Sequence, residues 1–164
     1  MKFPPNLIQS RYLSPLGPMI LAANGARLAG VWFEDQRHLP DSSAWARTDA
    51  DPVLRQTATQ LSEYFAGKRR QFELPLDLGN GTPFQRAVWR ALQGIAYGTH
   101  TSYGALSQAI GKPAAVRAVG GAVGRNPLSI VVPCHRVLGA RGALTGYAGG
   151  LERKVKLLQR ESQV

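Results

Sequence analysis

The sequence has only one cysteine, Cys134, among 164 residues. A single cysteine cannot form a disulfide within the chain, and it excludes a zinc site built from several cysteines. No stretch approaches the roughly 18 consecutive apolar residues of a membrane-spanning helix, and the first residues lack the apolar run of a secretory signal. A hydrophobic fraction of 44% is typical of a folded chain rather than a disordered one. We therefore expect a cytoplasmic protein with no metal, no cofactor and no membrane partner.

Acidic side chains are absent from a long part of the sequence, between Asp77 and Glu152. Residues 1–81 carry nine Lys or Arg and eight Asp or Glu, whereas residues 82–164 carry eleven Lys or Arg and two Glu. Ordinary solvated surfaces mix both signs, so the net charge of +9 in the second half favours an anionic partner. A phosphate backbone attracts arginines and repels carboxylates, which makes nucleic acid the first candidate. A basic protein that is merely soluble is the alternative.

The first half of the chain predicts a β-hairpin followed by a helix. Pro18–Ala23 and Arg27–Phe33 flank Asn24-Gly25, a pair typical of a tight hairpin turn. Asp51 and Pro52 are suited to begin a helix, because aspartate caps helices and proline is tolerated at the first helical position. The apolar side of this helix is expected to comprise Leu54, Ala58, Leu61 and Phe65.

The segment after this helix predicts a boundary between two domains. Gln71–Leu76 is expected to return as a strand, and Leu78–Gly81 is then the best candidate linker. The linker coincides with the change in charge. We therefore expect an α/β N-terminal domain at residues 1–80 and a C-terminal domain at residues 81–164.

The second half predicts mostly helices. Thr82-Pro83-Phe84-Gln85 is a capping box with proline at the first helical position, and Ser102 is suited to cap a second helix from Tyr103. Gly111-Lys112-Pro113 separates that helix from a third at Ala114–Gly124, which is the spacing of a helix-turn-helix DNA-binding motif. The third helix is nearly bare of large side chains. Such a helix suits either tight packing in a core or deep entry into a DNA groove.

The cysteine lies near the end of the chain in a distinctive setting. Ser129–Val132 has the apolar run of a buried strand and leads directly into Pro133-Cys134-His135-Arg136-Val137. The positive charge of neighbouring imidazole and guanidinium groups favours a reactive thiolate, although an isolated cysteine is also compatible with an inert, buried residue. On a straight strand the side chains of residues 134 and 135 would point to opposite faces, so their contact requires a turn or a bridging water. After the glycine-rich segment Gly139–Gly150, a final helix is expected at Leu151–Arg160. This helix is expected to be amphipathic, with Leu151, Val155 and Leu158 on one side.

The pentapeptide Pro133-Cys134-His135-Arg136-Val137 resembles the signature of the O6-alkylguanine-DNA alkyltransferases, also called methylated-DNA–protein-cysteine methyltransferases. The resemblance extends over residues 83–161, in order and at the family's spacing. Its further motifs are Tyr97-Gly98, Ser102-Tyr103, Ala118-Val119-Gly120, Asn126-Pro127, Gly146-Tyr147 and Gly149-Gly150-Leu151. Residues 1–80 match more loosely, at Ser14–Gly17 and Tyr64–Gly67.

The resemblance implies a fold and an activity. The fold is a ribonuclease-H-like α/β N-terminal domain followed by a mostly helical C-terminal domain with a winged helix-turn-helix DNA-binding motif. The activity is direct-reversal DNA repair, in which Cys134 irreversibly takes an alkyl group, such as methyl, from O6-alkylguanine, with O4-alkylthymine as a second candidate substrate. The chain would thus be a methylated-DNA–protein-cysteine S-methyltransferase that reacts once. Its partner would be double-stranded alkylated DNA, contacted in the minor groove with the guanine flipped out. We expect a monomer, with cooperative assembly on DNA left open.

The resemblance also implies roles for individual residues. Cys134 would be the nucleophile, His135 the base acting through water, and Glu161 the partner of the other imidazole nitrogen. Asn126 would hydrogen-bond the backbone of the active-site turn, and Tyr103 would donate a proton or hydrogen bond to the departing guanine. Arg117 would fill the space left by the flipped base. The remaining residues expected to contact DNA are Tyr103, Ala118, Gly120 and Arg125, and those expected to line the guanine pocket are Val137, Tyr147, Ala148 and Gly149. From the residues alone, Arg117 also fits an ordinary phosphate contact and Glu161 a solvated helix end.

Two other classes of protein fit part of the pattern. A lesion sensor or a helix-turn-helix regulator would bind DNA without chemistry, but the alkyltransferase-like sensors lack the nucleophilic cysteine that is present here. A cysteine hydrolase would use Cys134 and His135, but it would leave the basic half unexplained. Two features depart from some relatives: Ala148 stands where they have serine, which removes one hydroxyl contact to the guanine oxygen, and the zinc of animal relatives is not expected.

Overall fold

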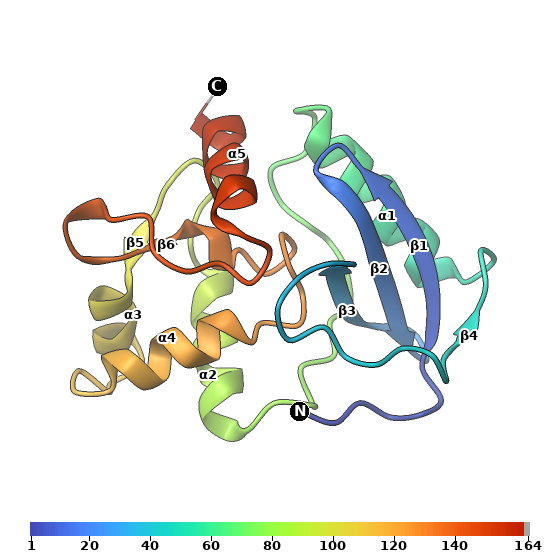
Figure 1. Ribbon diagram of the computed structural model, residues 1–164, viewed down its shortest axis with the longest axis horizontal. Helices are drawn as coiled ribbons and strands as arrows, with labels where there is room; N and C mark the ends of the chain where they lie inside the picture. The colour runs from blue at the N-terminus through green and yellow to red at the C-terminus, as the bar shows by residue number, and fades with distance from the viewer. Residues whose placement is uncertain (163–164) are drawn as a thin grey trace. The chain divides into compact units, whose positions relative to one another are not determined.

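The computed structural model describes residues 1–162 and divides the chain into two compact units, Met1–Asn80 and the residues from Gly81 onward (Figure 1). The first unit is an α/β domain and the second is mostly helical, as predicted. Within residues 1–162, no helix combines the length and the apolar composition that a membrane crossing requires.

The first unit is built on the predicted hairpin. β2 (Gly17–Asn24) and β3 (Arg27–Phe33) pair antiparallel, and Gly25 in the turn has the left-handed φ of 58° that the Asn-Gly pair indicates. β1 (Ile8–Ser14), which was not predicted, pairs antiparallel with the other side of β2. The two-residue β4 (Ala46–Arg47) pairs parallel with β1, so the sheet has the order β3-β2-β1-β4.

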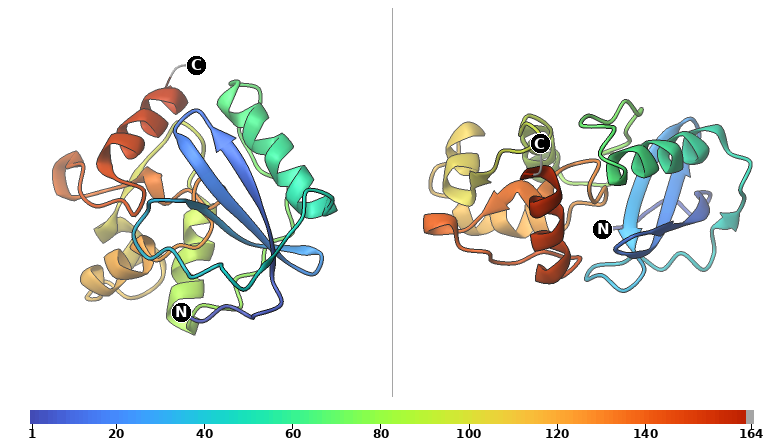
Figure 2. Two further views of the ribbon diagram at one scale, coloured as in Figure 1. Left: turned by 45° about the vertical axis from the view of Figure 1, so that its right-hand side comes forward. Right: turned by 90° about the horizontal axis from the view of Figure 1, so that it is seen from above.

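A single helix covers one face of this sheet. α1 (Pro52–Phe65) packs against β1, β2 and β3, and the views of Figure 2 show it running along the strands. Its start is the predicted one, since Asp51 Oδ1 accepts a 2.9 Å hydrogen bond from the backbone N–H of Leu54. Of the predicted apolar side, three side chains are buried and one is half-buried: Leu54, Leu61 and Phe65, and Ala58, respectively.

The strand predicted at Gln71–Leu76 is wrong, because only its last residue pairs with the sheet, through a bridge between Leu76 and Leu28. Two features stop the ladder from extending. The Gln60 side chain hydrogen-bonds both the backbone N–H and the carbonyl of Glu73. Pro75 has no N–H to donate.

The second unit opens with the predicted helices. α2 (Pro83–Gln93) has a complete capping box at Thr82, and Ser102, the last residue of β5 (Thr101–Ser102), caps α3 (Tyr103–Ala109). α4 (Val116–Gly124) starts two residues later than predicted and has no side-chain cap. α3 and α4 contact each other and form the helix-turn-helix, and both also contact α2.

The rest of the second unit carries the cysteine. It consists of η1 (Cys134–Arg136), β6 (Val137–Leu138), which pairs parallel with β5, η2 (Ala140–Gly142) and α5 (Leu151–Ser162). The strand predicted at Ser129–Val132 is wrong: the segment is a buried turn, because Ile130 adopts a left-handed φ of 71° that no extended chain allows. The apolar residues expected on one side of α5 are not the ones that it buries. The helix buries Lys154, Leu157 and Glu161 instead of Leu151, Val155 and Leu158.

Candidate active site around Cys134

The backbone before Cys134 makes two tight turns of opposite hand. The N–H of Val131 donates to Ser129 O at 2.8 Å across Ile130, and the N–H of Cys134 donates to Val132 O at 2.8 Å across Pro133. The first has the positive φ of the strained γ-turn, whereas Pro133, at φ −81° and ψ 63°, has the common inverse form. A β-branched residue in the left-handed region costs about 1–3 kcal/mol and persists only where the surroundings impose it. The thiol is therefore placed by a strained and fully buried turn.

Asn126 ties this turn together. Its side-chain amide donates a 2.8 Å hydrogen bond to Val132 O, and its side-chain oxygen accepts a 3.0 Å bond from the N–H of Leu128. The residue is buried, with 3% of its surface exposed. The structure thus contains the backbone contacts expected of Asn126, and its contribution to reactivity stays a prediction.

The sulfur of Cys134 is buried among hydrogen-bond donors. Burial raises the pKa of the Cys134 thiol, while a hydrogen bond from Asn126, the charge of Lys154 and backbone N–H groups of residues 134 and 135 act in the opposite direction. The neutral thiol is therefore the resting form at neutral pH. The donors around it are suited to stabilise a thiolate once the proton has left.

The imidazole of His135 contacts α5 through Glu161. Its Nε2 lies 2.7 Å from Glu161 Oε1, and because a carboxylate only accepts, Nε2 carries the proton. Nδ1 is then a proton acceptor, and it is buried with no hydrogen-bond partner among residues 1–162. Burial lowers the pKa of His135 below 6.5, despite the opposing effect of Glu161. A neutral imidazole with an available lone pair thus lies one residue from the thiol.

Glu161 is the centre of an ion-pair network. Arg136 donates three hydrogen bonds to its carboxylate, at 2.7, 2.9 and 3.2 Å, and a fourth at 2.6 Å to the carbonyl of Ile95. Burial alone would raise the pKa of Glu161, but the hydrogen bonds from His135 and Arg136 outweigh it and lower the pKa to about 2. The Glu161 carboxylate is therefore ionised and held in one position. Arg136 donates its side-chain hydrogen bonds to this carboxylate and to Ile95, and none to the thiol.

Lys154 is a member of the site that the sequence reasoning missed. Its side chain is fully buried, and its Nζ donates to the carbonyls of Val137, Thr145 and Gly146 at 2.6, 3.0 and 3.1 Å. Burial lowers the pKa of Lys154, and the negative charge of a Cys134 thiolate would raise it. Nothing in the sequence distinguishes this lysine from its solvated neighbours except its spacing, one and two turns before Leu157 and Glu161.

Tyr103 of α3 lies close to Thr145, to Lys154 of α5 and to Gly120 of α4. Its hydroxyl donates a 3.3 Å hydrogen bond to Thr145 O, which also accepts from Lys154, and the Lys154 ammonium lies 5.9 Å from the centre of its ring. A side chain at Gly120 in α4 would lie 3.9 Å from the same ring. Burial and the charge of Cys134 raise the pKa of Tyr103, so its hydroxyl keeps its proton.

The exposed face of α4 has mostly small side chains, with an arginine near each end of the helix. Val116, Arg117, Ala118 and Gly121 are exposed, and so is Arg125 just beyond the helix. Val119, Ala122 and Val123 are buried, and the Ala122 carbonyl accepts a 2.8 Å hydrogen bond from Trp89 Nε1. One side of α4 is therefore packed against the rest of the second unit, and the side with mostly small residues faces solvent.

The residues predicted to line a guanine pocket lie in the segments that follow the cysteine. Val137 is fully buried, and its carbonyl accepts a hydrogen bond from Lys154. Tyr147 and Ala148 are half-buried, and Gly149 is buried. Their part in binding a base stays a prediction. Residues 1–162 contain no cluster of three His, Cys, Asp or Glu side chains that could hold a metal ion.

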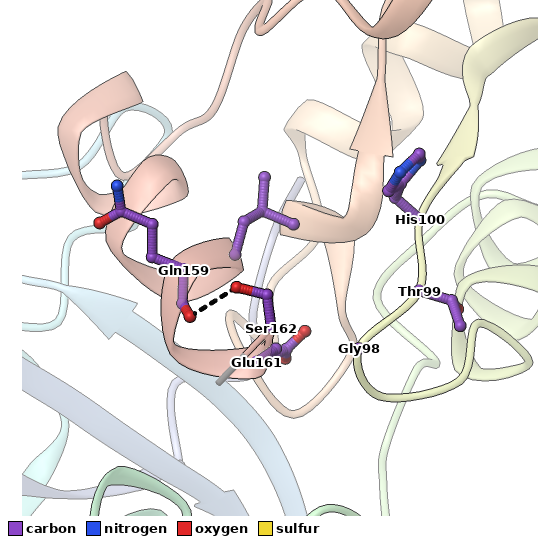
Figure 3. Close-up of a pocket in the computed structure, with 7 residues that line it drawn as sticks. Gly98, Thr99, His100, Gln159, Glu161 and Ser162 are labelled. Carbon is purple, nitrogen blue, oxygen red and sulfur yellow. Dashed lines mark hydrogen bonds between the residues drawn. The ribbon is translucent and has the colours of Figure 1, made fainter. Parts of the chain in front are cut away.

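A cavity of about 270 Å³ reaches Glu161 from the C-terminal half of α5 (Figure 3). It is lined by Gly98, Thr99, His100, Leu158, Gln159, Glu161 and Ser162. The hydroxyls of Thr99 and Ser162 are already bonded to the carbonyls of Ala96 and Gln159. Since neither Cys134 nor Tyr103 lines it, this cavity is not where a substrate would meet the thiol.

Comparison with known proteins covers nearly the whole chain. Residues 7–78 match the family model for the ribonuclease-like domain of 6-O-methylguanine DNA methyltransferase, and residues 83–163 match the model for its DNA-binding domain. A methylated-DNA–protein-cysteine methyltransferase of Mycobacterium leprae is 47% identical over 148 residues, which cover 90% of this chain and 88% of the relative. One from Haemophilus influenzae is 43% identical over 156 residues, covering 94% and 86%. The crystal structure of Mycobacterium tuberculosis OGT in complex with DNA superimposes with a TM-score of 0.86 at 44% identity, over 94% of this chain and 92% of that one.

Proposed function

The chain belongs to the 6-O-methylguanine DNA methyltransferase family, and from this premise we propose that it repairs DNA by direct reversal, as a methylated-DNA–protein-cysteine methyltransferase. It moves an alkyl group from O6-alkylguanine in DNA to a cysteine, and Cys134 is the single candidate that the sequence offers. The observation that carries the proposal is the setting of this thiol. It is buried among N–H donors, beside a neutral imidazole, in a unit with a net charge of +9.

Activation of the thiol falls to His135. No hydrogen bond joins its Nδ1 to the sulfur among the described residues, so we assign the transfer to a bridging water. The proton leaves Cys134 and ends on Nδ1, and the resulting imidazolium is stabilised by the Glu161 carboxylate at 2.7 Å. Asn126 and the backbone N–H groups then stabilise the thiolate.

Transfer is an in-line displacement at the alkyl carbon. The sulfur–carbon bond forms as the carbon–O6 bond breaks, and the electron pair of the broken bond stays on guanine. Tyr103 is suited to protonate the departing guanine, because its hydroxyl is protonated at neutral pH. The proton held by His135 replaces the one that Tyr103 loses, so the proton that left Cys134 is balanced by the one on guanine.

Access to the lesion requires the nucleotide to leave the base stack, because the O6 atom lies on the major-groove edge of the base whereas the protein is proposed to approach from the minor groove. The small, exposed face of α4 is suited to enter the minor groove, where Arg117 would take the place of the flipped base. Ala118, which is exposed, and Gly120, which is half-buried beside the ring of Tyr103, are proposed to allow the helix a close approach. Arg125, exposed just beyond the helix, is proposed to contact a phosphate. Val137, Tyr147, Ala148 and Gly149 are the proposed wall of the guanine pocket. The binding unit is proposed to be one monomer on double-stranded DNA.

The reaction ends with the protein consumed. A thioether is a poor leaving group, and the single cysteine leaves no second thiol to remove the alkyl group. Each molecule therefore reacts once.

The experiment that tests the proposal is intact-protein mass spectrometry after incubation with a duplex oligonucleotide that contains one O6-methylguanine. We expect a stoichiometric gain of one methyl group, absent in Cys134→Ser. A protein that binds the lesion but gains no mass would be a lesion sensor. Repeated release of product without a mass gain would indicate a hydrolase.

A further inference from the structure

Tyr97, in the connection between α2 and β5, contacts the buried ion pair of the site. The guanidinium of Arg136 lies over its ring, with Cζ 5.7 Å from the ring centre. An arginine at this distance is attracted to the π face of an aromatic ring, and the attraction is stronger where water is excluded. Arg136 is 6% exposed and Tyr97 is half-buried. The ring therefore attracts a guanidinium that has lost most of its contact with water.

The same connection makes two further contacts with the ion pair. The Ile95 carbonyl accepts a 2.6 Å hydrogen bond from Arg136 Nη1. A Cβ atom at Gly98 would lie 3.3 Å from the carbonyl oxygen of Glu161, and both residues line the cavity of Figure 3. Gly98 has a left-handed φ of 77°, which glycine adopts without strain. The backbone on both sides of Tyr97 is thus held against the ion pair.

The position of Arg136 affects the hydrogen bond of His135, because the two side chains share one oxygen atom. Oε1 of Glu161 accepts a 2.7 Å hydrogen bond from Arg136 Nη2 and lies 2.7 Å from His135 Nε2. Arg136 Nε donates to Oε2 at 2.9 Å, so the guanidinium fixes the plane of the carboxylate. The partner of one ring nitrogen decides which nitrogen of a neutral imidazole carries the proton. A displaced carboxylate would therefore let the proton move from Nε2 to Nδ1, which could then no longer accept one.

We propose that Tyr97 is a positioning residue for alkyl transfer: its ring holds the Arg136 guanidinium, which through Glu161 keeps the proton of His135 on Nε2. The inference rests on the proposed alkyl transfer to Cys134, in which Nδ1 takes the thiol proton. Tyr97 exchanges no proton in this scheme. Its aromatic face acts and its hydroxyl does not, so phenylalanine should replace it.

The test observes the imidazole directly, by ¹H–¹⁵N NMR of protein labelled with ¹⁵N-histidine at pH 7.5. The chain has three histidines, and the signals of His135 are those that disappear in His135→Gln. We expect one tautomer, protonated on Nε2, in wild type and in Tyr97→Phe. In Tyr97→Leu we expect shifts averaged between two tautomers. The matched control is Tyr12→Leu, which should keep the single tautomer, because Tyr12 is a half-buried tyrosine of the first unit whose hydroxyl lies 3.0 Å from Ser62 Oγ.

The single-turnover rate with O6-benzylguanine provides the second measurement. It should fall about fivefold to tenfold in Tyr97→Leu, which is part of the roughly 100-fold or greater contribution of a general base, and stay within about twofold of wild type in Tyr97→Phe. A Tyr97→Leu protein that keeps the single Nε2–H tautomer would overturn the inference even if it reacted slowly, because the ring would then only fill space. Loss of the tautomer in Tyr97→Phe would overturn it as well, since the aromatic face would not be what acts.

Two further outcomes are distinguished from these. If circular dichroism shows that Tyr97→Leu does not fold, Tyr97→Met removes the ring while keeping a long, flexible apolar side chain, and the same comparison of tautomers decides. The proposed function fails by a different result. Wild-type protein that takes no benzyl group from O6-benzylguanine would refute alkyl transfer from guanine and leave the comparison of His135 tautomers intact.

Discussion

Replacing Glu161 by glutamine should destabilise the protein by about 3 kcal/mol at neutral pH, and this loss should shrink as the pH falls. The pKa of Glu161 is lowered from 4.5 to about 2 in the folded protein. A difference of that size corresponds to about 3 kcal/mol of folding free energy. Removing one partner of a buried ion pair typically costs about 3–5 kcal/mol of folding free energy, which agrees with the value from the pKa.

The pH dependence follows from the direction of the shift. A carboxylate with a lowered pKa stabilises the folded state fully above its unfolded pKa of 4.5, and this contribution is lost as the pH falls toward 2. The difference in unfolding free energy between wild type and Glu161→Gln should therefore be largest at pH 7 and about half as large near pH 3. Urea denaturation at pH 7, 5, 4 and 3, followed by circular dichroism, measures it.

The matched control is Glu152→Gln, on the same helix. Glu152 is exposed and pairs with Lys156 at 2.9 Å, so its removal should cost less than about 0.5 kcal/mol. A loss below about 1 kcal/mol for Glu161→Gln at pH 7, or an equal loss at pH 3, would contradict the assignment of this stability to the Glu161 carboxylate.

Three further predictions concern the reaction itself. Arg117→Ala should slow repair of O6-methylguanine in duplex DNA by roughly tenfold or more while leaving the reaction with free O6-benzylguanine nearly unchanged, because only the duplex requires base flipping; equal losses in single-turnover rates would contradict the role given to this residue. The rate with O6-benzylguanine should fall only below pH 6.5, because burial lowers the pKa of His135 and the imidazole stays neutral above that value. An acid limb that persists in His135→Gln would assign it to another group. Asn126→Ala should lower the unfolding free energy by about 1–3 kcal/mol, since a buried carbonyl and N–H lose their partner, and it should slow alkylation of Cys134. A destabilised variant with a wild-type alkylation rate would leave Asn126 with a structural role only.

Local signals in the sequence were sufficient for much of the fold. The Asn24-Gly25 turn and the caps at Asp51, Thr82 and Ser102 each depend on a few adjacent residues, and all of them are present in the structure. The run Ser129–Val132 failed because a short apolar stretch fits a strand or a buried turn equally well. An isoleucine does not predict a positive φ, and at position 130 the surrounding structure imposes it.

The site was predictable as far as the family resemblance extended. The resemblance led to the pairing of His135 with Glu161, two residues separated by a loop and a helix, and the structure contains their hydrogen bond. It gave no indication of Lys154, because a lysine in an amphipathic helix is ordinarily solvated. Arg136 was expected to favour the thiolate, whereas it pairs with Glu161 and Ile95. Each of these errors concerns a partner that only the folded chain brings near.

The strained turn at Ile130 has a consequence for how this protein can change over generations. The backbone at this position favours glycine, whereas the core around its side chain, which is 1% exposed, favours a large aliphatic residue. Glycine would relieve the backbone and leave a cavity, whereas another β-branched residue such as valine would retain the strain. Each of these substitutions exchanges one cost for the other. The path of the chain into Cys134 therefore depends on a compromise between backbone and core at position 130.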